Sequence, residues 1–240
     1  MKEYDLIVVG TGSAMNVVEG AIQENPKIKV AVIDKDDPGG ICLTRGCIPS
    51  KILLYPAEVV RTIEHAGRFG INVDVKQIAF GMVMERMRNL IHEDMKTVRE
   101  GLSNSRNIDF YNAAARFIAP YTLKVGDDAI TSKTIILGAG SKPMIPPIKG
   151  IEEAGYLTSD TLLRLDRLPE SLVIIRGGFI GAEYGHFFSA MGSKVTIIDR
   201  NQQFLSEEEP EISAIAKKEL QKHMEIINNY EVHEAGEDLT

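Results

Sequence analysis

The sequence predicts an α/β protein, because one strand–turn–helix–strand pattern occurs twice along the chain. Each copy has two short apolar runs around one helical pattern: 4–9, 14–25 and 29–33 in the first, and 171–175, 177–192 and 194–198 in the second. Each copy also has a glycine-rich turn after its first run and an aspartate after its last. Apolar runs of this length are typical of buried parallel strands. Two copies at matched spacing favour two domains, each built on a parallel sheet.

The chain between and after the copies predicts further elements. We expect a loop at 37–50, helices at about 48–66 and 76–104, an antiparallel meander at 108–136, a proline-rich linker at 143–147, a helix from 211 and a strand at 226–235. Short alternating runs favour antiparallel strands, and proline clusters favour connections without regular structure. We therefore expect one domain over residues 1–146 and a second, truncated domain over 147–240.

Composition excludes several classes of function. The chain has 240 residues, 44% of them apolar, and a net charge of -7, which is ordinary for a globular protein and gives no reason to expect a nucleic-acid partner. No apolar run approaches the roughly 18 residues of a membrane span. The first apolar run is too short for a signal peptide, so we expect a cytoplasmic protein without a membrane partner. Two cysteines do not make a disulfide scaffold, and a close pair more often does chemistry or binds metal.

The first glycine turn has the features of a dinucleotide-binding fingerprint. Gly10 allows a tight turn, and Gly12 allows backbone to approach a pyrophosphate at the start of the next helix, where Ser13 and Ala14 lie. Asp34 ends the following strand, where an acid accepts hydrogen bonds from a ribose. A purely structural glycine turn is the alternative, but the complete context favours a Rossmann-like βαβ unit.

The second glycine turn is less regular. Gly178 and Gly181 occupy the second and third glycine positions of the fingerprint, but Arg176 occupies the first. A tight turn prefers glycine there, so we expect the arginine to strain the turn or to obstruct the pyrophosphate, with an added phosphate contact as the alternative. Asp199 favours a free ribose hydroxyl and hence NADH over NADPH.

The most specific segment lies between the two turns and contains both cysteines. Cys42 and Cys47 are separated by four residues and lie at the expected start of a helix. A helix N-terminus lowers the pKa of the nearer thiol and stabilises its thiolate. A zinc site would need about four ligands, and no second cysteine or histidine cluster accompanies the pair, so we expect no metal. Two inert buried cysteines are the other alternative, which the polar, glycine-rich surroundings disfavour.

With the segment from Gly39 to Lys51 (GGICLTRGCIPSK) in place, the chain resembles the class I pyridine nucleotide–disulfide oxidoreductases. Within this family it most resembles the dihydrolipoamide dehydrogenases, with the mercuric and glutathione reductases as relatives. The resemblance extends over essentially the whole chain. It implies FAD in the first domain, NAD in the second, a small dithiol or disulfide substrate of the lipoamide type, and a homodimer for the full-length protein.

The resemblance also implies roles for single residues. Cys47 would be the thiol against the flavin, and Cys42 the thiol that exchanges with substrate. Lys51 would lie near the flavin and pair with Glu183, and Phe179 would be the gate for nicotinamide. The cofactor contacts implied by the fingerprints and the family pattern are Gly10, Gly12, Ser13, Ala14, Asp34, Lys35, Gly39, Gly40, Lys51, Ala115, Ala139, Gly140, Ser141, Gly177, Gly178, Phe179, Ile180, Gly181, Glu183 and Asp199.

Family members are considerably longer than this chain and carry a C-terminal domain with a histidine–glutamate pair. None of the five histidines here has a matching context, so we expect the isolated chain to be inactive alone. A related disulfide or mercuric reductase, or a non-catalytic flavin-binding subunit, are the alternative functions.

Overall fold

The computed structural model of the chain describes residues 1–236, which form two compact units. Unit 1 consists of Met1–Ile48 and Asn89–Lys142, and unit 2 of Pro49–Arg88 and Pro143–Thr240. Two long helices, α3 (Cys47–His65) and α4 (Phe80–Asn104), each begin in one unit and end in the other.

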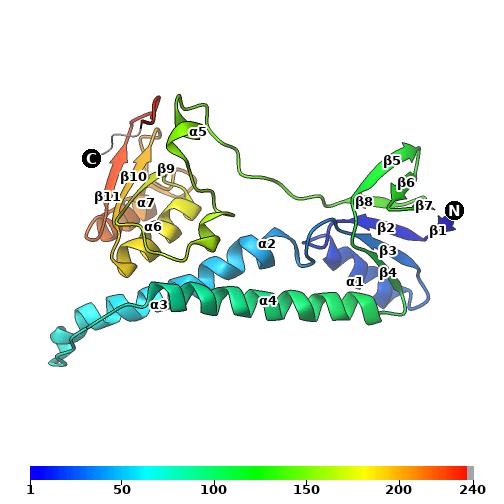
Figure 1. The fold of residues 1–240 in the computed structure, drawn as a ribbon, viewed down its shortest axis with the longest axis horizontal. Coiled ribbons are helices and arrows are strands. Elements are labelled where there is room, and N and C mark those ends of the chain that lie inside the picture. The colour runs from blue at the N-terminus through cyan, green and yellow to red at the C-terminus, as the bar shows by residue number, and fades with distance from the viewer. Residues whose placement is uncertain (237–240) are drawn as a thin grey trace. The chain divides into compact units, whose positions relative to one another are not determined.

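Unit 1 contains two four-stranded sheets. Its other elements are β1 (Lys2–Glu3), β2 (Leu6–Val9), α1 (Met15–Glu24), β3 (Val30–Ile33), α2 (Gly40–Arg45), β4 (Ile108–Tyr111), β5 (Ala115–Ala119), β6 (Thr122–Val125), β7 (Asp128–Thr131) and β8 (Ile135–Leu137). One sheet is parallel, in the order β4-β3-β2-β8 (Figure 1). In the other, β6 is antiparallel to β5 and β7, and β1 joins β7 in parallel.

The parallel sheet is buried on both faces, which explains the continuous apolar runs in the sequence. Val8 packs in one core cluster with Val18 of α1, whereas its neighbour Ile7 packs in a second cluster with Leu123 and Ile130 of the antiparallel sheet. Successive side chains of a strand point to opposite faces, so both faces of β2 need apolar residues. The strand therefore carries no polar side chain between Leu6 and Val9.

Unit 2 contains a parallel sheet of three strands among the described residues, in the order β11-β10-β9. Besides parts of α3 and α4, its elements are the 3₁₀ helix Ala66–Phe69, α5 (Ile151–Ala154), the 3₁₀ helix Leu162–Arg164, β9 (Ser171–Ile175), α6 (Phe179–Met191), β10 (Lys194–Asp199), α7 (Pro210–Leu220) and β11 (Glu225–Asn228). Helix α6 packs on β9 and β10 (Figure 1). Its Phe187 and Phe188 are fully buried and contact the ring of Phe80 at 6.1 Å between ring centroids.

The predicted α/β class is confirmed, and each predicted βαβ copy forms a helix and two parallel strands close to the expected bounds. The meander predicted over 108–136 is partly wrong. Only β5, β6 and β7 are antiparallel neighbours, whereas β4 and β8 join the parallel sheet beside β3 and β2. A short apolar run identifies a strand but not its partner, and parallel partners lie far apart in sequence.

Two further predictions were wrong in detail. The loop predicted at 37–50 contains helix α2, which follows Gly39 with a φ of 120° and starts at Gly40 with a φ of 65°. The strand predicted at 226–235 ends at Asn228, because Asn229 has a φ of 59° and leaves the extended conformation. Asparagine is one of the few residues that tolerate this region.

The compact units do not follow the single boundary predicted at residue 146, because residues 49–88 group with the second half of the chain. The assignment of 1–146 to FAD and of 147–240 to NAD stays a prediction. Residues 237–240 of the second domain lie outside the described residues.

The aromatic cluster of unit 2 gives a test of this packing. Phe187→Ala should lower the free energy of unfolding by about 3–5 kcal/mol, because a fully buried ring is replaced by a cavity. Phe69→Ala is the matched control, since its ring is 81% exposed and its loss should change stability by less than about 0.5 kcal/mol. Urea unfolding followed by far-UV circular dichroism measures both, and equal losses would contradict the assignment of the core.

Candidate functional site

The turn after β2 requires glycine at its first position. Gly10 has a φ of 106°, and its N–H donates to the carbonyl oxygen of Ile33 at 2.7 Å. The N–H of Gly138, just after β8, donates to Val9 at 2.7 Å. A Cβ atom on Gly10 would overlap the carbonyl oxygen of Gly138. The sheet therefore brings two backbone segments together at a point where no side chain fits.

Thr11 connects this turn to two other predicted parts of the site. It is 4% exposed, and both its N–H and its hydroxyl donate to Asp34 Oδ2, at 2.9 and 2.5 Å. The same hydroxyl accepts a hydrogen bond from the N–H of Gly39 at 2.9 Å. We did not predict a role for Thr11. The available signal was a small hydroxyl residue between two turn glycines, in a βαβ unit that closes with an aspartate.

The first turn fits a dinucleotide in three respects. Helix α1 has no side-chain cap at Ala14, and the N–H groups of Met15, Asn16 and Val17 donate to the carbonyl oxygens of Gly12, Ser13 and Ala14. The N–H groups of Gly12, Ser13 and Ala14 themselves have no acceptor within residues 1–236, so they are open to an anion. A Cβ on Gly40 would overlap the Cα of Gly12, so glycines keep side chains out of this close approach. Asp34 is only partly buried, and its Oδ1, which accepts from the N–H of Asp36 at 3.0 Å, keeps a second lone pair for a ribose hydroxyl.

Other residues predicted to contact FAD are divided between the turn region and the sheet. Gly140 has a φ of 74°, and a Cβ on it would lie 3.1 Å from Cδ1 of Ile41, so the stretch 139–141 runs beside α2. Lys35 forms an ion pair with Asp36 at 2.8 Å. Ala115 lies in β5 and packs on the core cluster shared by the two sheets of unit 1.

The two cysteines lie at the junction of α2 and α3. Cys42 is within α2, Cys47 is the first residue of α3, and both are exposed and free of a disulfide. A Cβ on Gly46 would lie 2.9 Å from the carbonyl oxygen of Ile41 and 3.3 Å from the Cα of Cys42, so glycine is what allows α3 to start so close to α2.

The two cysteine side chains interact. A side-chain hydrogen bond with Cys47 raises the pKa of the Cys42 thiol, and partial burial raises it further. Within residues 1–236 no three His, Cys, Asp or Glu side chains are grouped so that they could hold a metal.

Unit 2 brings together another predicted pair. The ammonium group of Lys51 on α3 donates to the carboxylate of Glu183 on α6. Both side chains keep solvent exposure, so the pair is open to further contacts.

The second glycine turn also has the expected framework. Gly178 caps α6, Phe179 and Ile180 are exposed, and a Cβ on Gly181 would overlap the carbonyl oxygen of Arg176. Asp199 is 2% exposed, in contrast to the partly exposed Asp34.

The Asp199 carboxylate is engaged inside unit 2. Its Oδ1 accepts from the N–H of Asn201 at 3.1 Å, and its Oδ2 would lie 3.0 Å from a Cβ on Gly177. The spacing of the sequence motif gave no sign of this burial.

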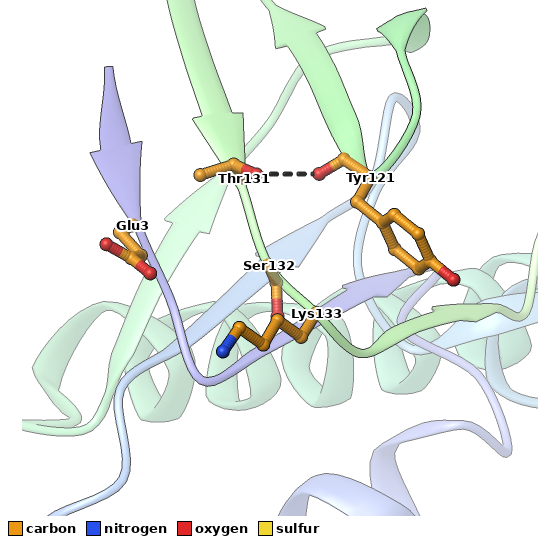
Figure 2. Close-up of a pocket in the computed structure, with 5 residues that line it drawn as sticks. All are labelled: Glu3, Tyr121, Thr131, Ser132 and Lys133. Carbon is orange, nitrogen blue, oxygen red and sulfur yellow. Dashed lines mark hydrogen bonds between the residues drawn. The ribbon is translucent and has the colours of Figure 1, made fainter.

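A pocket of about 420 Å³ in unit 1 contains none of the predicted site residues. Figure 2 shows its lining, which consists of Glu3, Tyr121, Thr131, Ser132 and Lys133. The hydroxyl of Thr131 donates to the carbonyl oxygen of Tyr121 at 2.9 Å, and that of Ser132 to the carbonyl oxygen of Asp5 at 3.1 Å. These hydroxyls hold local backbone in place, and we assign the pocket no function.

Comparison with protein families identifies the family of this chain. A family model described as pyridine nucleotide-disulphide oxidoreductase matches residues 4–239. The chain belongs to this family. Members use FAD and NAD(P), as the resemblance to this family implied. No helix within residues 1–236 is long and apolar enough to cross a membrane.

Individual relatives differ in what their names say they act on. Mycothione reductase of Mycobacterium tuberculosis is 32% identical over 95% of this chain and 52% of its own length. Dihydrolipoyl dehydrogenase of Chlamydia pneumoniae is 35% identical over 88% of this chain and 46% of its own length. Mercuric reductase of Lysinibacillus sphaericus is 31% identical over 90% of this chain and 40% of its own length. The chain thus spans about half or less of the length of these relatives.

The fold is also similar to a solved structure. The Cu(II) complex of the HOCl-induced flavoprotein disulfide reductase RclA from Escherichia coli matches with a TM-score of 0.82 and 27% identity. The match covers 98% of this chain and 51% of that chain.

The close approach of the Gly138 carbonyl oxygen to Gly10 gives a testable prediction. Gly10→Ala should destabilise the protein by on the order of 2–4 kcal/mol, because the new Cβ meets backbone and the positive φ is strained. Gly20→Ala is the matched control. It lies in α1 with no atom within 4 Å of a new Cβ, and the change should stabilise by about 0.5–1 kcal/mol. Urea unfolding measures both, and a neutral Gly10→Ala would show that the turn does not depend on this contact.

Proposed function

We propose that this chain supplies the FAD- and NAD-binding parts of an NAD-dependent FAD disulfide oxidoreductase. In this proposal residues 1–146 bind FAD, residues 147–240 bind NAD, and electrons pass between NAD(H), FAD and a Cys42–Cys47 disulfide. The observation that carries the proposal is the exposed, hydrogen-bonded pair of thiols beside the Gly39–Gly40 backbone, which Thr11 connects to the first turn.

The two thiols have distinct proposed roles. When the pair is oxidised, a substrate thiolate attacks the sulfur of Cys42, the Cys42–Cys47 bond breaks, and Cys47 leaves as the thiolate. The second substrate thiol then attacks the mixed disulfide, which releases oxidised substrate and leaves Cys42 reduced. Each oxidised substrate thus delivers two electrons and two protons. Bound FAD would accept these electrons from the cysteine pair and pass them to NAD.

We propose dihydrolipoamide as the dithiol. The cysteine segment supports this choice, and the dihydrolipoyl dehydrogenases of Arabidopsis thaliana and Chlamydia pneumoniae are 34% and 35% identical to this chain. The mercuric and mycothione reductases are 31% and 32% identical, so the margin is small. Reduction of another disulfide or of mercuric ion, or flavin binding without turnover, are the outcomes that a substrate assay distinguishes.

The remaining site assignments belong to the same proposal. Asp34 holds the ribose of FAD, and the backbone of Gly12, Ser13 and Ala14 faces its pyrophosphate. The Lys51–Glu183 pair acts on the flavin, and Asp199 on the ribose of NAD. The complete enzyme is proposed to be a cytoplasmic homodimer, with the base for thiolate formation outside this chain, since a positioned base contributes about 10²–10⁴-fold to such a step.

The roles of the two cysteines can be separated spectroscopically. In the FAD-loaded chain, reduction should produce a long-wavelength absorbance band from the Cys47 thiolate and flavin. Cys47→Ser should abolish the band, and Cys42→Ser should keep it while abolishing thiol exchange with a disulfide dye.

The opposite pattern would exchange the two roles. A band that survives both substitutions would contradict the electron path through the cysteines.

A further inference from the structure

Arg176 occupies in unit 2 the position that Gly10 occupies in unit 1. Each follows the first strand of its βαβ unit, and each N–H donates to a carbonyl at the end of the neighbouring strand. The distances are 2.7 Å for Gly10 to Ile33 and 2.8 Å for Arg176 to Ile198. The φ angles are 106° and 89°. The two turns therefore have the same backbone form, and one of them is built with an arginine.

This conformation is strained for any residue that has a Cβ. Two hydrogen bonds and one close backbone approach hold it in place. The N–H of Arg176 bonds to Ile198, and the next carbonyl, that of Gly177, accepts from the N–H of Leu205 at 2.8 Å. Gly181 lies directly against the Arg176 carbonyl oxygen. The strand, the helix and the segment at Leu205 thus impose the geometry on a residue that does not favour it.

The arginine side chain is accommodated because of a difference between the two sheets. In unit 1, β8 runs beside β2, and Gly138 after it fills the space that a side chain of Gly10 would need. In unit 2, β9 is an edge strand among the described residues. The Arg176 side chain is exposed and forms no hydrogen bond or ion pair within residues 1–236. Within this part of the chain, the Arg176 side chain therefore makes no hydrogen bond or ion pair that would offset the backbone strain.

We propose that Arg176 limits the affinity of unit 2 for its pyridine nucleotide by reducing the fraction of molecules whose glycine turn is in the binding form. This inference rests on the proposed function. The turn precedes Gly177 and Gly178, the backbone that a pyrophosphate approaches. An apparent dissociation constant rises in proportion as the competent fraction falls. Arg176 acts here through the conformation of the turn and not through its charge.

Four versions of the full chain separate conformation from charge: the original, Arg176→Gly, Arg176→Asn and Arg176→Lys. Glycine accepts positive φ freely, asparagine partly, and lysine no better than arginine. We expect Arg176→Gly to bind NADH most tightly and Arg176→Asn less tightly. The original chain and Arg176→Lys should bind it most weakly and with equal affinity. Quenching of NADH fluorescence measures these affinities. Arg176→Gly should tighten binding by roughly 5- to 150-fold, the population equivalent of the usual strain in this region. Its thermal unfolding temperature should also rise.

Three results would overturn the inference. In the first, Arg and Lys bind NADH more tightly than Gly and Asn, most at low salt, which identifies a phosphate ligand. In the second, Arg176→Gly is more stable but binds NADH with unchanged affinity. In the third, neither the original chain nor Arg176→Gly binds NADH. FAD binding by the same four proteins should be equal, and its absence in all of them would count against the proposed function itself.

Discussion

Unit 1 depends on the close approach of backbone segments around the turn at Gly10. The end of β8 passes over this turn at Gly138, and the start of α2 meets it at Gly40, in both cases where a side chain would overlap backbone. Thr11 then joins the turn to Asp34 and to Gly39. One crowded point therefore positions the N-terminus of α1, Asp34 and the start of the cysteine segment, so the residues proposed to bind FAD and those proposed to carry out the redox chemistry share one support.

Unit 2 has a glycine turn of the same backbone form, but the first position of this turn is less crowded. Because no described strand lies beside β9 as β8 lies beside β2, the first position of its turn has room for Arg176. The backbone keeps its form there, and the cost appears as strain at one residue. The acids differ as well, since Asp199 is buried where Asp34 is partly exposed. A duplicated motif with matched spacing thus does not produce two equivalent sites.

The sequence was sufficient for the features that depend on short-range pattern. Apolar runs and glycine turns located both βαβ units, and the cysteine segment led to the correct family. Features that depend on partners distant in sequence were not predicted, as the parallel pairing of β4 and β8 shows. Thr11 was missed for the same reason, because its importance comes from Asp34 and Gly39, which only the fold brings to it.

The turn at Gly10–Gly12, with Asp34, is proposed to be an FAD site. Equilibrium binding of FAD to the chain, compared between Asp34→Asn and Asp127→Asn, tests this proposal most directly. Asp127 is an exposed acid of the same unit, so both variants lose one negative charge. We expect saturable binding that Asp127→Asn leaves unchanged and that Asp34→Asn weakens by on the order of tenfold or more, the usual value of a hydrogen bond to a charged group. Equal affinities in the two variants, or no saturable binding by the original chain, would contradict the proposal.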